Sequence, residues 1–194
     1  RYALCAIRNV GTEAMSQLVA EREANGEFAD LTDFLKRIPQ AVANKKQMEN
    51  LIRAGALDSL NGNRRELLEN VEAILAFAET VRQDAQSSQD SLFSGDDALD
   101  KTVHMQPFED WSGMDRLREE FESLGLYLSA HPLDGYAGRL DKLKVITAND
   151  LAAMIESRNL KPRVNLAGSV SAKQVRISQR GNKFAFVQFT DQTG

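Results

Sequence analysis

Apolar residues recur at helical spacing through the first two-thirds of the chain. Five segments carry the pattern: Met15/Leu18/Val19, Leu31/Phe34/Leu35/Ile38, Met48/Leu51/Ile52, Leu67/Val71/Ile74/Leu75/Ala78 and Leu117/Phe121/Leu124/Leu128. A spacing of three and four residues places these side chains on one face of a helix. Gly26 and Pro39 follow the first two segments, and Gly55 and Gly62 lie at the boundaries of the next two. Glycine and proline at these places are typical of helix ends. The pattern predicts short amphipathic helices joined by tight turns.

The pattern changes to alternation from Arg163 onward. Apolar residues at every second position, such as Val164, Leu166 and Val170, are typical of strands, and a further apolar run follows the turn at 179–182. An independent barrel needs about five strands, whereas two or three fit here. The predicted fold class is therefore mainly α, followed by a partial β-barrel with an unpaired edge.

Periodicity is lost between about Asp84 and Asp110, where Gln, Ser, Asp and Gly dominate. Such a composition is typical of a linker that is too polar to pack. The chain is therefore expected to comprise a helical domain at 1–83, a flexible linker at 84–110, connecting helices at 111–160 and incomplete strands at 163–194.

Composition is that of an ordinary globular protein, with 42% hydrophobic and 27% charged residues among 194. Cys5 is the single cysteine, which excludes a disulfide framework and a cysteine-based zinc site. No apolar run approaches the roughly 18 residues of a membrane span, so we expect a cytoplasmic protein with no membrane partner. Arg1 stands where a methionine would begin a complete chain, and a piece of a longer protein is expected.

Charge is distributed unevenly along the chain, although the net charge is only −4. Residues 1–65 carry 10 basic against 8 acidic side chains, residues 66–125 carry 4 against 15, and residues 126–194 carry 10 against 5. Contacts with phosphate are therefore expected from the two ends of the chain and not from its middle.

Two glycine turns are candidates for binding the DNA backbone. In the first, Asn9, Val10 and Gly11 precede a helix whose N-cap is expected at Thr12. A helix N-terminus binds phosphate through backbone N–H groups and reads no sequence. The second turn and the basic residues around both turns complete the predicted set, which is Ala54, Gly55 and Ala56 with Lys45, Lys46, Arg64 and Arg65. Neither turn has a doubled glycine, and packing of helices without DNA contact is the alternative interpretation.

The pentapeptide Gln89-Asp90-Ser91-Leu92-Phe93 stands out within the polar stretch. Adjacent exposed apolar side chains, such as Leu92 and Phe93, indicate a partner surface. A local contact of the pair with the neighbouring helices is the alternative.

Other candidate chemistry is weak, and no catalytic or metal-binding residue is predicted. His131 lies between Ser129 and Asp134, but members of a catalytic triad usually converge from distant segments. Asp96 and Asp97 lie in the polar stretch, where no rigid element would hold a cation. A nuclease or ligase of the helix-hairpin-helix kind is a further alternative. It would need a carboxylate cluster or a nucleophilic lysine in an ordered element, and neither is evident in the sequence.

Three stretches resemble the alpha subunits of bacterial DNA polymerase III, the replicative C-family DNA polymerases. They are YALCAIRNVG at 2–11, LIRAGALDSL at 51–60 and LGLYLSAHPLD at 124–134. The resemblance covers the whole chain in order. It implies the end of the fingers, a tandem helix-hairpin-helix, a clamp-binding segment, connecting helices and the start of an OB-fold.

The resemblance also implies roles for these parts. In that family the catalytic aspartates lie in a palm domain upstream, so this segment is expected to be inert and without a cofactor, while the parent is a DNA-directed DNA polymerase using Mg. The paired hairpins hold duplex DNA, the OB-fold lies near single-stranded template, and residues 89–93 match the clamp-binding pentapeptide, with Asp90 where Leu is often found. Expected partners are duplex DNA, the sliding clamp and other replisome subunits at the nucleoid. Error-prone relatives of the polymerase and a helical scaffold that binds only protein are the alternatives.

Overall fold

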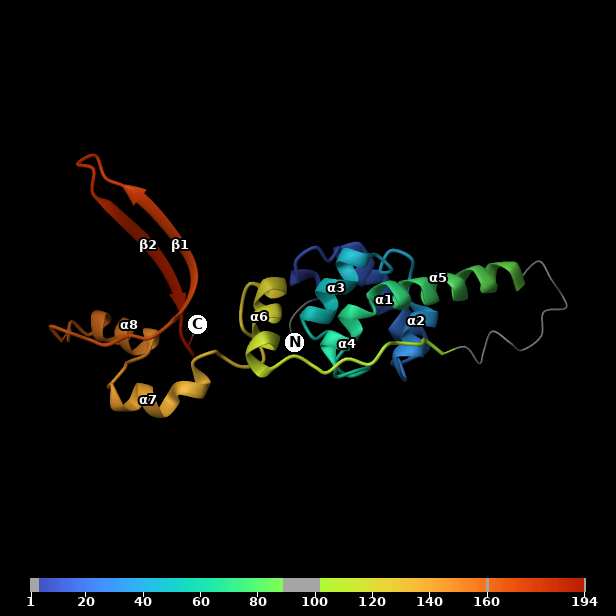
Figure 1. Cartoon of the computed structure of the whole chain (residues 1–194), viewed down its shortest axis with the longest axis horizontal. Helices are drawn as coiled ribbons and strands as arrows, with labels where there is room; N and C mark the ends of the chain where they lie inside the picture. Colours follow the sequence, from blue (N-terminus) through green and yellow to red (C-terminus); the bar gives the residue numbers. More distant parts are fainter. Residues whose placement is uncertain (1–3, 89–101, 160, 194) are drawn as a thin grey trace. The chain divides into compact units, whose positions relative to one another are not determined.

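The computed structural model describes residues 4–88, 102–159 and 161–193. The chain divides into two compact units, Arg1–Tyr127 and Leu128–Gly194. The first is helical and the second combines short helices with a β-ribbon (Figure 1).

In its described residues, 4–88 and 102–127, the helical unit contains one 3₁₀ turn and six α-helices. Their bounds are η1 Leu4–Ala6, α1 Thr12–Asn25, α2 Leu31–Arg37, α3 Lys45–Arg53, α4 Arg64–Glu69, α5 Val71–Ser88 and α6 Gly113–Leu124. A side-chain oxygen of the N-cap residue accepts from a first-turn N–H in α2, α3, α4 and α6; the caps are Asp30, Asn44, Asn63 and Ser112. These polar residues set where the helices begin.

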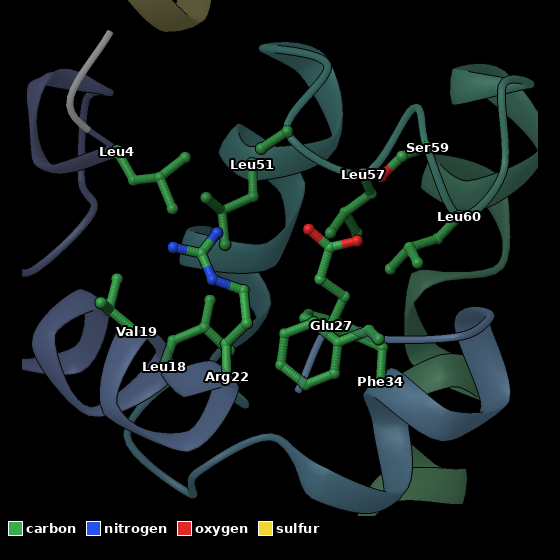
Figure 2. Close-up of a pocket in the computed structure, with 12 residues that line it drawn as sticks. Leu4, Leu18, Val19, Arg22, Glu27, Phe34, Leu51, Leu57, Ser59 and Leu60 are labelled. Carbon is green, nitrogen blue, oxygen red and sulfur yellow. The ribbon is translucent and has the colours of Figure 1, made fainter. Parts of the chain in front are cut away.

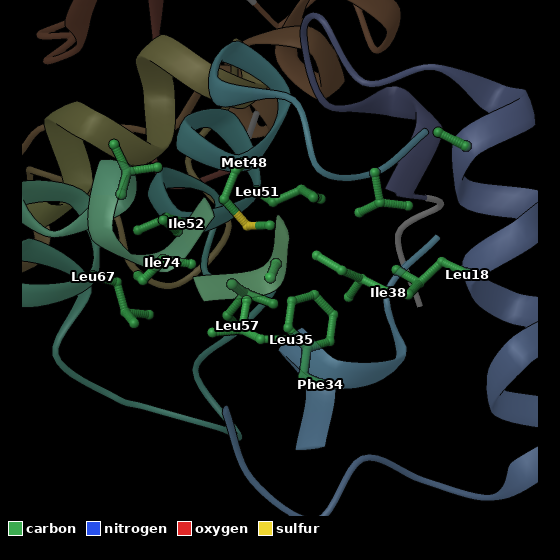
Figure 3. Packing of buried hydrophobic residues seen from close by; sticks show 14 of the residues in the cluster. Leu18, Phe34, Leu35, Ile38, Met48, Leu51, Ile52, Leu57, Leu67 and Ile74 are labelled. Atoms are coloured by element: carbon green, nitrogen blue, oxygen red, sulfur yellow. The ribbon is translucent and has the colours of Figure 1, made fainter. Parts of the chain in front are cut away.

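The core of this unit is formed by the apolar faces of α1 to α5. Phe34, Leu35, Met48, Leu51 and Ile52 are each 1% exposed or less, and they interlock from α2 and α3 (Figure 3). The helical spacing in the sequence therefore identified most core positions of α1 to α5, whereas Leu128, predicted on the same face as Leu117, is 56% exposed and lies beyond the end of α6. The predicted segment from Leu67 to Ala78 is two helices and not one, because α4 ends at Glu69, with Asn70 as its C-cap, and α5 begins at Val71.

Asn70 also ties a later part of the chain to this unit. Its side chain donates to the Gln106 carbonyl oxygen and accepts from the Gln106 N–H, both at 2.8 Å, in the manner of a neighbouring strand. Asn63 donates to the Phe108 carbonyl oxygen at 2.7 Å. The predicted linker at 84–110 is therefore wrong at both described ends, because α5 continues to Ser88 and residues 102–110 are held on α4 and α5 (Figure 1). The candidate pentapeptide, residues 89–93, lies outside the described residues.

The second unit carries η2 Asp134–Tyr136, α7 Ala137–Lys142 and α8 Ala148–Glu156, followed by β1 Ser169–Ile177 and β2 Lys183–Thr190. The strands pair antiparallel, with a bulge between Val170 and Ala172. Both strands lie in a two-stranded sheet, and its apolar side chains are exposed, Ile177 by 67% and Phe186 by 58%. The predicted order, mainly α and then β, is confirmed; the assignment of this sheet to an OB-fold stays a prediction.

His131 and Asp134 serve the local structure of this unit. The Asp134 carboxylate accepts from the His131 N–H at 2.7 Å and from the Gln192 side chain at 2.7 Å, which links the turn after Leu128 to the end of β2. The interpretation of this motif as a capped turn fits these bonds. Among the described residues, no helix is long and apolar enough to cross a membrane.

Candidate nucleic-acid interface

The first glycine turn leads directly into α1. Asn9 adopts a left-handed conformation with φ 60°, which Asn tolerates better than most residues. Gly11 is the N-cap, with φ −76°, and Thr12 is the first helical residue, so the prediction of Thr12 as N-cap is off by one position. A glycine in this position supplies no side-chain oxygen to the first turn of the helix.

At the N-terminus of α1, the N–H groups of the exposed residues Thr12 and Glu13 are therefore open to an external acceptor. Within the described part of the chain, no side chain caps α1, and the N–H groups of Thr12, Glu13 and Ala14 have no backbone acceptor. Met15 is the first residue whose N–H is bonded within the turn, to the Gly11 carbonyl oxygen at 3.1 Å. Such a row of free donors, with the positive end of the helix dipole behind it, is suited to a phosphate group.

The N-terminus of α3 lies beside that of α1. The Gly11 N–H donates to Oε1 of Gln47, in the first turn of α3, at 3.0 Å. Lys45 and Lys46 open α3, and its first turn contains no acidic residue. Lysines at this end oppose the helix dipole, an arrangement that an anionic ligand would stabilise.

The two lysines differ in their surroundings. Lys45 is half exposed and pairs with the carboxylate of Glu72 at 2.5 Å, which raises the pKa of Lys45 and lowers that of Glu72. Lys46 is exposed beside it. Because both ends of the Lys45–Glu72 pair face solvent, the pair does little to hold Lys45 away from a phosphate.

The second turn, in contrast, uses its own amides. Gly55 has φ 77°, and the N–H groups of Gly55 and Ala56 donate to the carbonyls of Ile52 and Leu51, both at 2.9 Å, a Schellman cap on α3. The Ala54 N–H donates to the Asn50 carbonyl at 3.0 Å. The prediction that these three amides grip phosphate is therefore not supported, since the C-terminal carbonyls of α3 already occupy them.

Arg64 is a structural residue and not a free basic side chain. It is 4% exposed, and its guanidinium donates to both carboxylate oxygens of Asp58 at 2.8 and 2.7 Å. Further bonds reach the Arg53 carbonyl at 3.1 Å and Glu120 at 3.4 Å. The predicted contact of Arg64 with DNA is therefore not supported, because the guanidinium is buried and its donors are engaged within the protein. Arg65 is half-buried, beside the Glu109 carbonyl oxygen.

An ionic network joins α6 to the second turn. Arg53 pairs with Glu119 at 3.0 Å, and Arg116 pairs with Asp58 at 2.9 Å. Burial raises the pKa of Asp58, but the hydrogen bonds and charges of Arg64 and Arg116 more than offset this, so the pKa lies below its ordinary value. At the other end of α6, Arg8 donates to the Glu122 carbonyl at 2.9 Å.

These positions divide the predicted site residues into two groups. Asn9 to Thr12 and Lys45 and Lys46 meet at the paired N-termini of α1 and α3, whereas Ala54 to Ala56 and Arg64 lie at the other end of α3. A helix of this length extends about 13 Å, so the two groups are not one surface. Gln47 was missed by sequence reasoning, although a Gln three residues after an Asn N-cap is a usable signal.

A hollow of about 440 Å³ lies near the C-terminal ends of α1 and α3 (Figure 2). Leu18, Val19 and Leu51 supply apolar walls, and the side chains of Arg22 and Glu27 point into the space. It is thus separate from the open amides of α1. In the described ranges, no three His, Cys, Asp or Glu side chains gather to hold a metal ion.

Comparisons with known proteins agree on the kind of protein that this chain resembles. The helix-hairpin-helix motif family matches residues 1–67. The whole chain is 39% identical to a segment of DNA polymerase III subunit alpha of Caulobacter vibrioides, 35% identical to that of Thermus aquaticus and 36% identical to that of Mycobacterium leprae. It spans 17%, 15% and 16% of the length of these relatives.

Proposed function

Because the chain corresponds along its whole length to one segment of bacterial DNA polymerase III alpha subunits, we propose that it is the part that holds duplex DNA and the sliding clamp. The parent protein is then a DNA-directed DNA polymerase that works with Mg at the nucleoid, in the cytoplasm. This segment supplies none of the reacting groups.

One observation carries the proposal of DNA binding. The uncapped N-terminus of α1, with the amides of the exposed residues Thr12 and Glu13 open, lies beside two lysines at the N-terminus of α3. These groups recognise phosphate oxygens through backbone donors and positive charge, and neither reads bases. Binding is therefore expected to be independent of sequence.

Salt dependence of duplex binding tests this proposal. If two to four phosphates are neutralised, the logarithm of the association constant falls against the logarithm of salt concentration with a slope of about −2 to −4. Lys45→Gln with Lys46→Gln should reduce the slope by about 2. Arg82→Gln with Arg118→Gln removes the same charge from the acidic middle of the chain, where no phosphate contact is expected, and is the matched control. A flat salt response of the unsubstituted chain excludes the proposal and favours a scaffold that binds only protein.

The clamp is proposed to bind residues 89–93. Support comes from the sequence of this pentapeptide and from the relatives; the structure adds that the preceding helix α5 and the following residues 102–110 are both fixed on the helical unit. Leu92 and Phe93 would each contribute about 1.5–3 kcal/mol on burial in an apolar cleft. Together they give at most about 6 kcal/mol, which corresponds to dissociation no tighter than about tens of micromolar. Such weak binding suffices when both partners are on one DNA, because the effective concentration is then high.

A binding assay with purified clamp tests this second part. Leu92→Ala with Phe93→Ala should abolish binding, whereas Asp96→Ala with Asp97→Ala, in the same stretch, should leave it within about twofold. Circular dichroism should give the same helical signal for both variants. Unchanged clamp affinity of the first variant would remove the pentapeptide as the binding site.

A further inference from the structure

Gln47 connects the two helix N-termini through a side chain that is only 6% exposed. Its Oε1 accepts from the Gly11 N–H at 3.0 Å. Its Nε2 donates to the Ala41 carbonyl at 3.1 Å and to the Val42 carbonyl at 3.4 Å. The amide group of Gln47 is therefore fixed from both ends, by the first turn of α1 and by the loop that leads into α3.

The chemistry of this position requires a neutral amide. Glutamic acid, the usual residue three positions after a polar N-cap, would accept from Gly11 but could not donate to the two carbonyls. It would also place a negative charge between two helix N-termini. An apolar side chain would leave the buried N–H and the carbonyls without partners. Gln47 links the two elements and adds no charge that competes with a phosphate.

We propose that Gln47 is a positioning residue that holds the N-termini of α1 and α3 in one register, so that both engage the same duplex. The inference rests on the proposed DNA binding of this surface. Gln47 itself is buried and does not touch DNA. With the link in place, the open amides of α1 and the lysines of α3 are arranged before DNA arrives, and less freedom is lost on binding.

The effect of breaking the link can be estimated from the salt dependence. If breaking the link removes one phosphate contact from the complex, the slope of the logarithm of the association constant against the logarithm of salt concentration becomes smaller by about 0.9. In 0.1 M salt this corresponds to about eightfold weaker binding. A loss of stability alone would not change the slope at temperatures well below unfolding.

Two substitutions each remove the hydrogen bond from the Gly11 N–H to Gln47 Oε1. One replaces the acceptor and the other replaces the donor. Gln47→Met keeps the size of the side chain and removes the acceptor. Gly11→Pro removes the donor, and its Cδ, in place of the N–H, pushes the Gln47 Oε1 away; the φ of −76° at Gly11 suits proline. Ile74→Val, a core change in α5, controls for a general loss of stability. The whole chain is titrated with a fluorescent duplex at several salt concentrations.

The inference predicts that each variant binds about eightfold more weakly in 0.1 M salt with a slope smaller by about 0.9, and that the double variant is no weaker than either. The Ile74→Val chain should match the unsubstituted chain. If the unsubstituted chain binds with the expected slope and both link variants match it, the positioning role is wrong and the proposed function stands. The positioning role would also be overturned if the Ile74→Val control lost as much duplex affinity and as much of the salt slope as the two link variants. If the unsubstituted chain itself gives no salt-dependent binding, the proposed function fails. Should Gln47→Met not fold, Gly11→Pro alone decides.

Discussion

Replacing Gly55 by Ala should destabilise the helical unit far more than an ordinary glycine substitution. A Cβ at this position would lie 2.0 Å from Nη2 and 2.5 Å from Cζ of Arg64. That guanidinium cannot simply move away, because Asp58, Glu120 and the Arg53 carbonyl hold it in a buried site. The left-handed backbone at Gly55 adds about 1–2 kcal/mol for any other residue. Disrupting a buried charge pair costs about 3–5 kcal/mol, so we expect about 4–7 kcal/mol in total.

Gly125 provides the matched control for the backbone contribution. It has φ 79°, close to the 77° of Gly55, but a Cβ there would meet only the end of the Arg8 side chain, at 3.0 Å. Gly125→Ala should therefore cost about 1–2 kcal/mol. Urea unfolding followed by circular dichroism measures both variants. A difference below about 1 kcal/mol between them would mean that Arg64 relaxes without loss, and the account of the second turn would be refuted.

Three further outcomes are expected. Glu13→Gln should strengthen duplex binding several-fold in low salt, because the carboxylate lies in the first turn of α1 among the open amides; unchanged affinity would place the DNA elsewhere. The lowered pKa of Asp58 means that the unfolded chain binds a proton more readily, so unfolding free energy should fall as pH drops below about 4. Asp58→Asn should flatten that pH dependence, and an unaltered profile would contradict the assignment. Asn70→Ala should speed hydrogen exchange at the Gln106 amide, because it removes both bonds between Asn70 and Gln106; the same rate in both chains would mean that other contacts fix residue 106.

Helical periodicity predicted the core well because it depends on local spacing. Phe34, Leu35, Met48 and Ile52 were placed correctly by a pattern that repeats every three to four residues. The break at Asn70 was not predictable in the same way, since the apolar positions continue in step across it. It follows from the bonds of Asn70 with Gln106, 36 residues later in the chain.

The site was harder to predict than the fold, for a related reason. Arg64 and Lys46 are both basic residues near a glycine turn, and composition does not distinguish them. The difference lies in Glu120, 56 residues after Arg64, which makes a buried site for the guanidinium. Gln47 likewise acquires its role from Gly11, 36 residues earlier. Long-range polar contacts of this kind leave no local periodic signal.

The amide resonances of the chain, followed by NMR as duplex DNA is added, test the central claim most directly. The account predicts that the N–H groups of Thr12 and Glu13 shift strongly, because these residues are exposed and their amides meet phosphate. The N–H groups of Gly55 and Ala56, which are bonded to the end of α3, should stay where they are. Shifts concentrated at Gly55 and Ala56, with α1 unaffected, would contradict the claim that the N-terminus of α1 holds the DNA backbone.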